Sequence, residues 1–135
     1  MPINDCKLIK LPRFEDSRGM LTFIENDNQI PFKINRIYYL YENKNMQVIR
    51  GQHAHKNLKQ LFIAISGSFD IFLNDGKEKK KYHLSSKDHG LYVCPMIWRE
   101  LSNFSSDAVC LVLASEKYDE EDYLHDFIDF QAKTD

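Results

Sequence analysis

The sequence predicts an all-β fold, and three observations support this class. Ten short stretches alternate apolar and polar residues or form brief apolar runs, turn-forming residues separate them, and no helical pattern comes between them. Short strands at a spacing of about 8–12 residues are typical of a sandwich or barrel. We therefore expect one domain over residues 1–135, with strands at 6–14, 20–25, 36–41, 47–53, 60–66, 68–74, 79–84, 90–94, 100–104 and 108–115.

The clearest turn is Asn74-Asp75-Gly76, which lies between the predicted strands 68–74 and 79–84. Asp-Gly supplies the positive φ that a tight hairpin turn requires. Similar turn chemistry occurs at Ser17-Arg18-Gly19, Ser66-Gly67-Ser68 and Asp88-His89-Gly90. These signals predict that the chain reverses direction between strands.

Only the C-terminal part has the pattern of a helix. Within residues 118–130, Tyr123, Phe127 and Phe130 follow one another at spacings of four and three, and residues 119–122 are all acidic. Acidic side chains in a first turn favour the positive end of the helix dipole. The pattern predicts a short amphipathic helix that covers one face of the barrel.

Composition limits the possible functions. The chain has 135 residues, of which 43% are hydrophobic and 28% are charged, and its net charge is −2. This balance is that of a soluble globular protein, and it argues against general nucleic-acid binding while allowing a local basic pocket for one phosphorylated ligand. No apolar run reaches the roughly 18 residues of a membrane span. The first residues lack the apolar core of a signal peptide, so we expect a cytoplasmic protein that does not contact membranes.

The segment Arg50-Gly51-Gln52-His53-Ala54-His55 is the strongest candidate for chemistry. Two residues at i and i+2 on a strand point to the same face, which in a small barrel means the interior. A single interior histidine is more often a satisfied core residue. Two histidines with an arginine nearby are costly to bury, so we interpret them as functional.

The residues that follow the histidine pair suggest a family. Gln60 and Gly67 come next, and Gly90, Pro95, Arg99 and Asn103 follow later in the chain. This order resembles the two sequence signatures of the cupin superfamily, and the resemblance implies a jelly-roll β-barrel with its site at the mouth. In metal-binding cupins two histidines, a glutamate and a later histidine hold one divalent ion. Here Gln60 and Arg99 occupy the last two of these positions.

That departure changes the expected chemistry. An amide is a poor metal ligand, and a guanidinium has no lone pair to give and stays cationic. We therefore expect neither a metal nor another cofactor, and a metal-dependent dioxygenase is the weakest alternative. Histidines without a metal can act as general acid or base, and nearby arginines can bind an anion such as a diphosphate.

An N-terminal turn agrees with this interpretation. Asp16-Ser17-Arg18-Gly19 precedes the predicted strand 20–25. It resembles the N-terminal element of metal-free cupins that act on nucleotide-linked sugars, such as the dTDP-4-dehydrorhamnose 3,5-epimerases. In that group the strand crosses to the partner subunit and the arginine contacts the diphosphate. The resemblance implies the same role for Arg18.

A closer resemblance covers nearly the whole chain. The segments 50–55, 90–100 and 111–123, together with Gln60, resemble the sugar 3,4-ketoisomerases, the WxcM-like cupins. The resemblance implies conversion of dTDP-4-keto-6-deoxyglucose to a 3-keto-6-deoxyhexose without a metal, by a homodimer with exchanged N-terminal strands. It also implies a PLP aminotransferase as the next enzyme, in a route to the 3-amino-3,6-dideoxyhexoses of O-antigens, lipopolysaccharide and S-layer glycans.

On this resemblance we assign roles to eight residues. We expect His53 to move the carbon-bound protons and His55 to orient it or to shuttle an oxygen-bound proton, and the reverse assignment stays open. Arg18, Arg50, Gln60 and Arg99 would bind the substrate, with Arg50 and Arg99 near the diphosphate or the enolate. The period of two places Tyr39 and Tyr41 on one face of their strand and Tyr38 on the other, and Tyr39 or Tyr41 is the candidate proton relay.

Two alternatives remain open at this point. One is a 3,5-epimerase of a related sugar, which would use the same proton abstraction but leave the carbonyl at C4. The other is a non-catalytic cupin that binds a sugar nucleotide, although a binding module does not need two titratable bases. The configuration of the product at C4, gluco or galacto, is not visible in the sequence.

Overall fold

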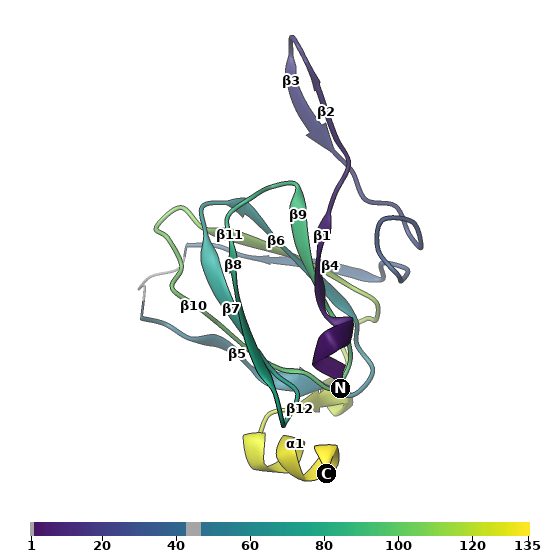
Figure 1. Cartoon of the computed structure of the whole chain (residues 1–135), viewed down its shortest axis with the longest axis vertical. Helices are drawn as coiled ribbons and strands as arrows, with labels where there is room; N and C mark the ends of the chain where they lie inside the picture. Colours follow the sequence, from purple (N-terminus) through teal and green to yellow (C-terminus); the bar gives the residue numbers. More distant parts are fainter. Residues whose placement is uncertain (1, 43–46) are drawn as a thin grey trace.

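Two five-stranded antiparallel sheets pack face to face in the computed structural model, which describes residues 2–42 and 47–135 (Figure 1). The first sheet has the order β1 (Lys7–Lys10), β9 (His89–Val93), β6 (Gln60–Ser66), β11 (Val109–Ala114) and β4 (Arg36–Leu40). The second has the order β12 (Tyr123–Leu124), β5 (Arg50–His55), β10 (Trp98–Ser102), β7 (Phe69–Asn74) and β8 (Lys79–Leu84). This arrangement confirms the predicted all-β fold with a short C-terminal helix.

The core lies between the two sheets. Side chains from both contribute to one buried apolar cluster, including Leu61 and Ile63 of β6 and Ile71 and Leu73 of β7. Leu91 of β9 is fully buried as well, and a Cβ added at the neighbouring Gly90 would lie only 2.8 Å from Leu61. The glycine therefore allows β9 and β6 to bring large side chains together at this point of the sheet.

The N-terminal region differs from the predicted single strand 6–14. β1 pairs with β9, and the chain then leaves the first sheet at Leu11 and Pro12 before β2 (Arg13–Asp16) begins. Proline cannot donate a backbone hydrogen bond to a ladder, which agrees with a break here. β2 pairs only with β3 (Gly19–Thr22), and this hairpin stands clear of the sandwich (Figure 1). Every residue of both strands is exposed.

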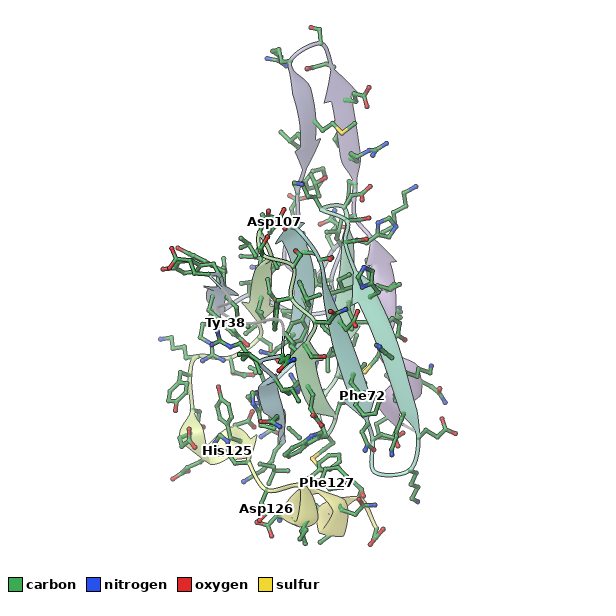
Figure 2. All side chains as sticks on the ribbon, turned by 90° about the vertical axis from the view of Figure 1, so that its left-hand side faces the viewer. Tyr38, Phe72, Asp107, His125, Asp126 and Phe127 are labelled. Atoms are coloured by element: carbon green, nitrogen blue, oxygen red, sulfur yellow. The ribbon has the colours of Figure 1, made fainter. Side chains whose placement is uncertain are left out.

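The predicted helix at 118–130 is wrong in position. Asp119 caps a short 3-10 turn at Glu120–Asp122, Tyr123 and Leu124 then pair with β5, and the α-helix α1 runs over Phe127–Thr134. The side chain of Asp126 accepts a hydrogen bond from Ile128 N at 2.8 Å and starts α1 there. Phe130 of this helix packs on Trp98, and Phe127 lies at the foot of the sandwich in Figure 2. In the described ranges no helix is long and apolar enough to span a membrane.

β5 and β10 are displaced from the predicted strands at 47–53 and 100–104, and their pairing contains a bulge. His53 lies opposite Arg99 and Arg50 lies opposite Leu101, so three steps on β5 match two steps on β10. Gly51 has φ +88° and Gln52 has φ +38°, which accommodates the extra residue. Without it, an odd spacing would place Arg50 and His53 on opposite faces. With it, both line the same cavity between the sheets.

Candidate active site

Two adjacent cavities lie where β4, the edge strand of the first sheet, faces β5 and β12 of the second. The His53 cavity has a volume of about 320 Å³, and its lining includes Tyr38, Arg50, His53, Phe62, Arg99 and Tyr123. The Tyr118 cavity has a volume of about 680 Å³, and its lining includes His55, Asn57, Lys117, Tyr118, Asp122 and Tyr123. Both are also lined by Arg36. Two candidate bases therefore lie beside a space large enough for a small ligand.

The two histidines of β5 are in direct contact, as the spacing predicts. Their ring centroids are 4.8 Å apart and the rings are perpendicular. His53 lines its cavity, whereas only 1% of His55 is exposed. His53 is thus the histidine that a ligand in the His53 cavity can touch.

Hydrogen bonds fix the protonation of both rings. His53 Nδ1 bonds the carbonyl oxygen of Gly51, and His55 Nδ1 lies 3.1 Å from Asp122 Oδ2. A carbonyl or carboxylate oxygen only accepts, so each Nδ1 carries a proton, and in the neutral ring Nε2 then has the lone pair. His55 Nε2 is buried and has no hydrogen-bond partner within residues 2–42 and 47–135. Both rings are therefore held as neutral bases.

Burial and charge keep these rings neutral well below pH 7. Burial, and then the Arg99 guanidinium, lower the pKa of His53 to about 4. The same two causes lower the pKa of His55 to about 2. A proton taken up by His53 therefore resides in an unfavourable positive field and is readily released.

Three side chains joined by hydrogen bonds lead to the His53 cavity. Arg99, which is 1% exposed, donates from Nη1 to Oε1 of Gln60, and Gln60 Nε2 donates to the hydroxyl of Tyr38 at 2.9 Å. Because the Tyr38 oxygen accepts from Gln60, its own O–H is free to donate to a ligand. Burial raises the pKa of Tyr38, which keeps that proton in place. Hydrogen bonds in series polarise one another, so Arg99 strengthens the Tyr38 donor.

The predicted tyrosines are on the wrong face. Tyr39 and Tyr41 are 58% and 55% exposed and contact each other on the outside of the first sheet, whereas Tyr38 lines the His53 cavity. Side chains do alternate along β4 as predicted, but the face with Arg36, Tyr38 and Leu40 is the one that lines the cavity. Both faces of this strand are aromatic, so its sequence does not show which face is internal.

The structure brings His53, Arg50, Gln60 and Arg99 together but leaves Arg18 elsewhere. Arg18 lies in the turn of the β2–β3 hairpin, where its side chain is 88% exposed and its Nη2 lies 2.6 Å from Asp16 Oδ2. It lines neither of the two cavities of its own chain. A role for Arg18 in binding therefore requires the hairpin to meet a second copy.

Asp122 and Tyr123 are site residues that the sequence did not reveal. The ring of Tyr123 lies 4.2 Å from that of His55 and 5.0 Å from that of His53. It also stacks on His125, which lies below Tyr38 on the left-hand side of Figure 2. In the sequence these residues resemble the acidic first turn and the apolar face of a helix. Only the pairing of β12 with β5 places them beside the histidines.

The donor groups do not fit a divalent metal ion. Gln60 Oε1 already accepts from Arg99, and the buried guanidinium would repel a cation at the same place. Within the described part of the chain, no group of three or more His, Cys, Asp or Glu side chains could hold a metal. The site thus differs in kind from that of a metal-binding cupin.

Comparison with known proteins identifies the family. The family FdtA, described as WxcM-like, C-terminal, matches residues 4–135. The chain belongs to this family. Its sequence is 43% identical over 125 residues to a TDP-4-oxo-6-deoxy-alpha-D-glucose-3,4-oxoisomerase of Aneurinibacillus thermoaerophilus, covering 93% of this chain and 89% of the relative.

Solved structures of similar proteins support the same family. The WlaRB TDP-quinovose 3,4-ketoisomerase of Campylobacter jejuni is 44% identical, with a TM-score of 0.90 over 95% of this chain and 98% of that one. A histidine-to-asparagine mutant of the 3,4-ketoisomerase QdtA of Thermoanaerobacterium thermosaccharolyticum, in complex with TDP-4-keto-6-deoxyglucose, is 39% identical. Its TM-score is 0.92 over 96% of this chain and 93% of that one. These relatives confirm the predicted family, the cupin fold and the isomerase class.

The epimerase alternative has weaker support. A dTDP-4-dehydrorhamnose 3,5-epimerase of Bacillus anthracis is 19% identical, with a TM-score of 0.77 over 91% of this chain and 79% of that one. At this identity the likeness shows a shared fold and nothing more.

Proposed function

We propose that this protein is a metal-independent 3,4-ketoisomerase that converts dTDP-4-keto-6-deoxy-D-glucose to a dTDP-3-keto-6-deoxyhexose through an enediolate. The observation that carries the proposal is the pair of neutral histidines beside a fixed hydroxyl donor, Tyr38, in the field of a buried arginine. These groups move protons and need no redox partner. The relative from Aneurinibacillus is named for a TDP-4-oxo-6-deoxyglucose, and the QdtA variant contains such a ligand.

The first step is removal of the proton at C3. The C4 carbonyl acidifies this proton, and Nε2 of His53 takes it. The electrons of the C3–H bond form the C3=C4 double bond, and the carbonyl electrons move to O4. Tyr38 donates a hydrogen bond to O4, and the charge of Arg99 stabilises the enediolate, as in other preorganised sites.

The second step completes the exchange of carbonyl and hydroxyl. The imidazolium of His53 returns its proton to C4, while the O3–H bond breaks and its electrons form the C3=O3 carbonyl. The oxygen-bound proton passes from O3 to O4, which are neighbours on the ring, through the hydroxyl of Tyr38. Protons and electrons balance without water or a co-reactant.

In this scheme His55 is a positioning residue. It is too deeply buried to touch the sugar, and its ring packs perpendicular to that of His53. Asp122 accepts from His55 Nδ1 and so holds that ring in one orientation. The pair thereby fixes the direction of the His53 lone pair.

The β2–β3 hairpin is proposed to meet a second copy of the chain. Phe14, Met20 and Leu21 are 62%, 60% and 59% exposed on it. A two-stranded hairpin is marginally stable alone, and contiguous exposed apolar side chains mark an interaction surface. In the resulting homodimer, Arg18 of one chain would bind the substrate diphosphate at the site of the other, beside Arg50.

The chemistry of the product indicates the neighbouring step. A 3-keto sugar is a substrate for a PLP-dependent aminotransferase, which would yield a 3-amino-3,6-dideoxyhexose for O-antigen, lipopolysaccharide or S-layer glycans. This place in the sequence of reactions follows from the family resemblance, and a cytoplasmic location is part of the same proposal.

Proton NMR of dTDP-4-keto-6-deoxyglucose incubated with the protein in D2O tests the activity. We expect resonances of a 3-keto sugar, with deuterium at C4 to the extent that the proton on His53 exchanges with solvent before it returns, and a parallel run in H2O gives the configuration of H4. Exchange at C3 and C5 with the carbonyl still at C4 would show an epimerase instead. An unchanged spectrum together with TDP binding would overturn this substrate assignment and favour a binding module or another sugar substrate.

A further inference from the structure

Two of the three cysteines of the chain lie side by side, although 88 positions separate them in the sequence. Cys6 directly precedes β1 and Cys94 directly follows β9, and the pairing of these two strands brings the cysteines together. Both are free thiols, with their Sγ atoms 3.7 Å apart. The sulfur atoms therefore need to approach by less than about 2 Å to form a disulfide bond.

A short 3-10 turn, η1 (Pro2–Asp5), lies against this pair and is the purple coil beside the N-terminus in Figure 1. The carbonyl oxygen of Pro2 accepts a hydrogen bond from Cys94 Sγ at 3.2 Å, and the backbone N of Cys6 donates to the carbonyl oxygen of Ile3. Cys6 and Cys94 are 3% and 6% exposed. A single turn opens more easily than a strand within a sheet, so a small oxidant reaches the sulfurs when η1 opens.

The two thiols differ in acidity. Cys94 Sγ has two acceptors within reach, the Pro2 carbonyl oxygen and Cys6 Sγ. The hydrogen bond from Cys94 lowers the pKa of Cys6, and the charge of Arg99 adds to this effect while burial opposes it. The contact with Cys6, together with burial, raises the pKa of Cys94. Cys6 is therefore the sulfur that ionises first, and the thiolate is the form that attacks an oxidant.

We propose that Cys6 and Cys94 form a peroxide-sensitive site that closes to a disulfide within the chain and fastens β1 to β9. The Cys6 thiolate attacks one oxygen of hydrogen peroxide, so an S–O bond forms, the O–O bond breaks and hydroxide leaves to become water. The Cys94 sulfur then attacks the Cys6 sulfur. The S–S bond forms, the S–O bond breaks, and the leaving hydroxide takes the thiol proton of Cys94. Two thiols thus give up two electrons and two protons, and one peroxide becomes two waters.

The position of the pair determines what the bond would hold. β1 is an edge strand of the first sheet, and the chain passes from it through Leu11 and Pro12 into the β2–β3 hairpin. A bond between Cys6 and Cys94 would fix the beginning of β1 to the end of β9. In a reducing compartment disulfides of this kind are transient, so the bond would form when peroxide is present and open again afterwards.

Thiol counting by mass spectrometry tests the proposal. The reduced, folded chain is treated with hydrogen peroxide and then denatured with an alkylating agent that marks each remaining thiol. We expect three marked thiols before treatment and one, Cys110, afterwards, and dithiothreitol should restore all three. A peptide map without reductant should show Cys6 joined to Cys94. The oxidised chain should have a Tm higher by about 5 °C or more, because the bond closes a long loop.

Cys110 of β11 supplies the matched control. It is fully buried, and burial raises the pKa of its thiol. Cys110→Ser should therefore lose both of its remaining thiols as the wild type loses two, whereas Cys6→Ser should form no disulfide within the chain. In urea the folded geometry is absent, and loop closure favours the pair that is nearest in sequence, Cys94 with Cys110.

Four results would overturn the site: three marked thiols after oxidation of the folded chain, a disulfide that includes Cys110, a disulfide between two chains, or the same products with and without urea. Oxidation of Cys6 to a sulfinic acid while Cys94 stays a thiol would also overturn it, because the two sulfurs would not meet. A disulfide that leaves Tm unchanged would overturn the fastening of β1. These measurements involve no sugar nucleotide, so their outcome is independent of the proposed isomerase activity.

Discussion

The interior of the sandwich and the β2–β3 hairpin differ in how their side chains are held. In the interior, a series of hydrogen bonds directs the side chains of the site: Arg99 bonds Gln60, Gln60 bonds Tyr38, and Asp122 bonds His55. On the hairpin, Phe14 and Leu21 remain exposed. The comparison teaches that the groups proposed to transfer protons are held by contacts within one chain, whereas the apolar residues of the hairpin are left exposed by the described part of that chain.

The largest expected effect comes from the interior. His53→Asn removes the base that takes the C3 proton, so kcat should fall by about 10²- to 10⁴-fold. TDP affinity and the oligomeric state should be unchanged, since the hairpin is untouched. Steady-state kinetics, TDP titration and light scattering measure these three quantities. Loss of the folded state would make His53 structural, and a normal kcat would move the base to another residue.

A substitution in the hairpin should change the oligomeric state and TDP affinity, the two quantities that His53→Asn leaves unchanged. Leu21→Lys places a charge on its apolar surface, and we expect the dimer to dissociate and TDP binding to weaken about tenfold or more as Arg18 is lost from the partner site. Size-exclusion chromatography with light scattering measures the first effect. Ile128→Lys is the matched control, because Ile128 is 77% exposed on α1. A monomeric wild type, or a variant that stays dimeric, would contradict the assembly.

Tyr38 and Tyr39 of β4 allow an interior and an exposed side chain to be compared within a single strand. Tyr38→Phe removes the donor to O4, and kcat should fall about 10- to 100-fold while KM changes little. Tyr39→Phe, one residue along and on the outer face, should leave kcat nearly unchanged. If Tyr39→Phe had the larger effect, the outer face of β4 would take part in catalysis.

The smallest expected effect is on how the free energy of unfolding depends on pH. The pKa of His53 is about 4 in the folded chain and near 6.5 in the unfolded one, so below pH 6.5 the unfolded state binds more protons. The free energy of unfolding should therefore fall as the pH is lowered from about 6.5 to about 4. His55 adds to this loss. Urea unfolding at several pH values measures the slope, which should be shallower in His53→Asn, and an equal slope in that variant would exclude His53 as its source.

Much of the fold could be predicted because strand periodicity is a local signal. The strands at 60–66 and 79–84 lie as predicted, and Asn74-Asp75-Gly76 forms the expected turn between β7 and β8. The segment around Tyr123 could not be placed, because its spacing suits a helix while pairing with β5 decides its conformation. Local sequence does not contain that distant partner.

The same distinction applies to the site. His53, Gln60 and Arg99 could be found from family motifs, whereas Tyr38 and Asp122 required the tertiary structure. Tyr38 and Tyr39 are chemically identical, and only the packing of β4 shows which one faces the cavity. Asp122 is one of four consecutive acidic residues, and only its contact with His55 distinguishes it.

The bulge in β5 links the length of this segment to its composition. Gly51 and Gln52 together oppose one residue of β10, which lets Arg50 and His53 line the same cavity across an odd spacing. Deleting one of these two residues would leave an even spacing, and a regular strand without the bulge would keep both side chains on the same face. Libraries that redesign the cavity can therefore shorten this segment by one residue, whereas keeping its length requires residues at positions 51 and 52 that tolerate a positive φ.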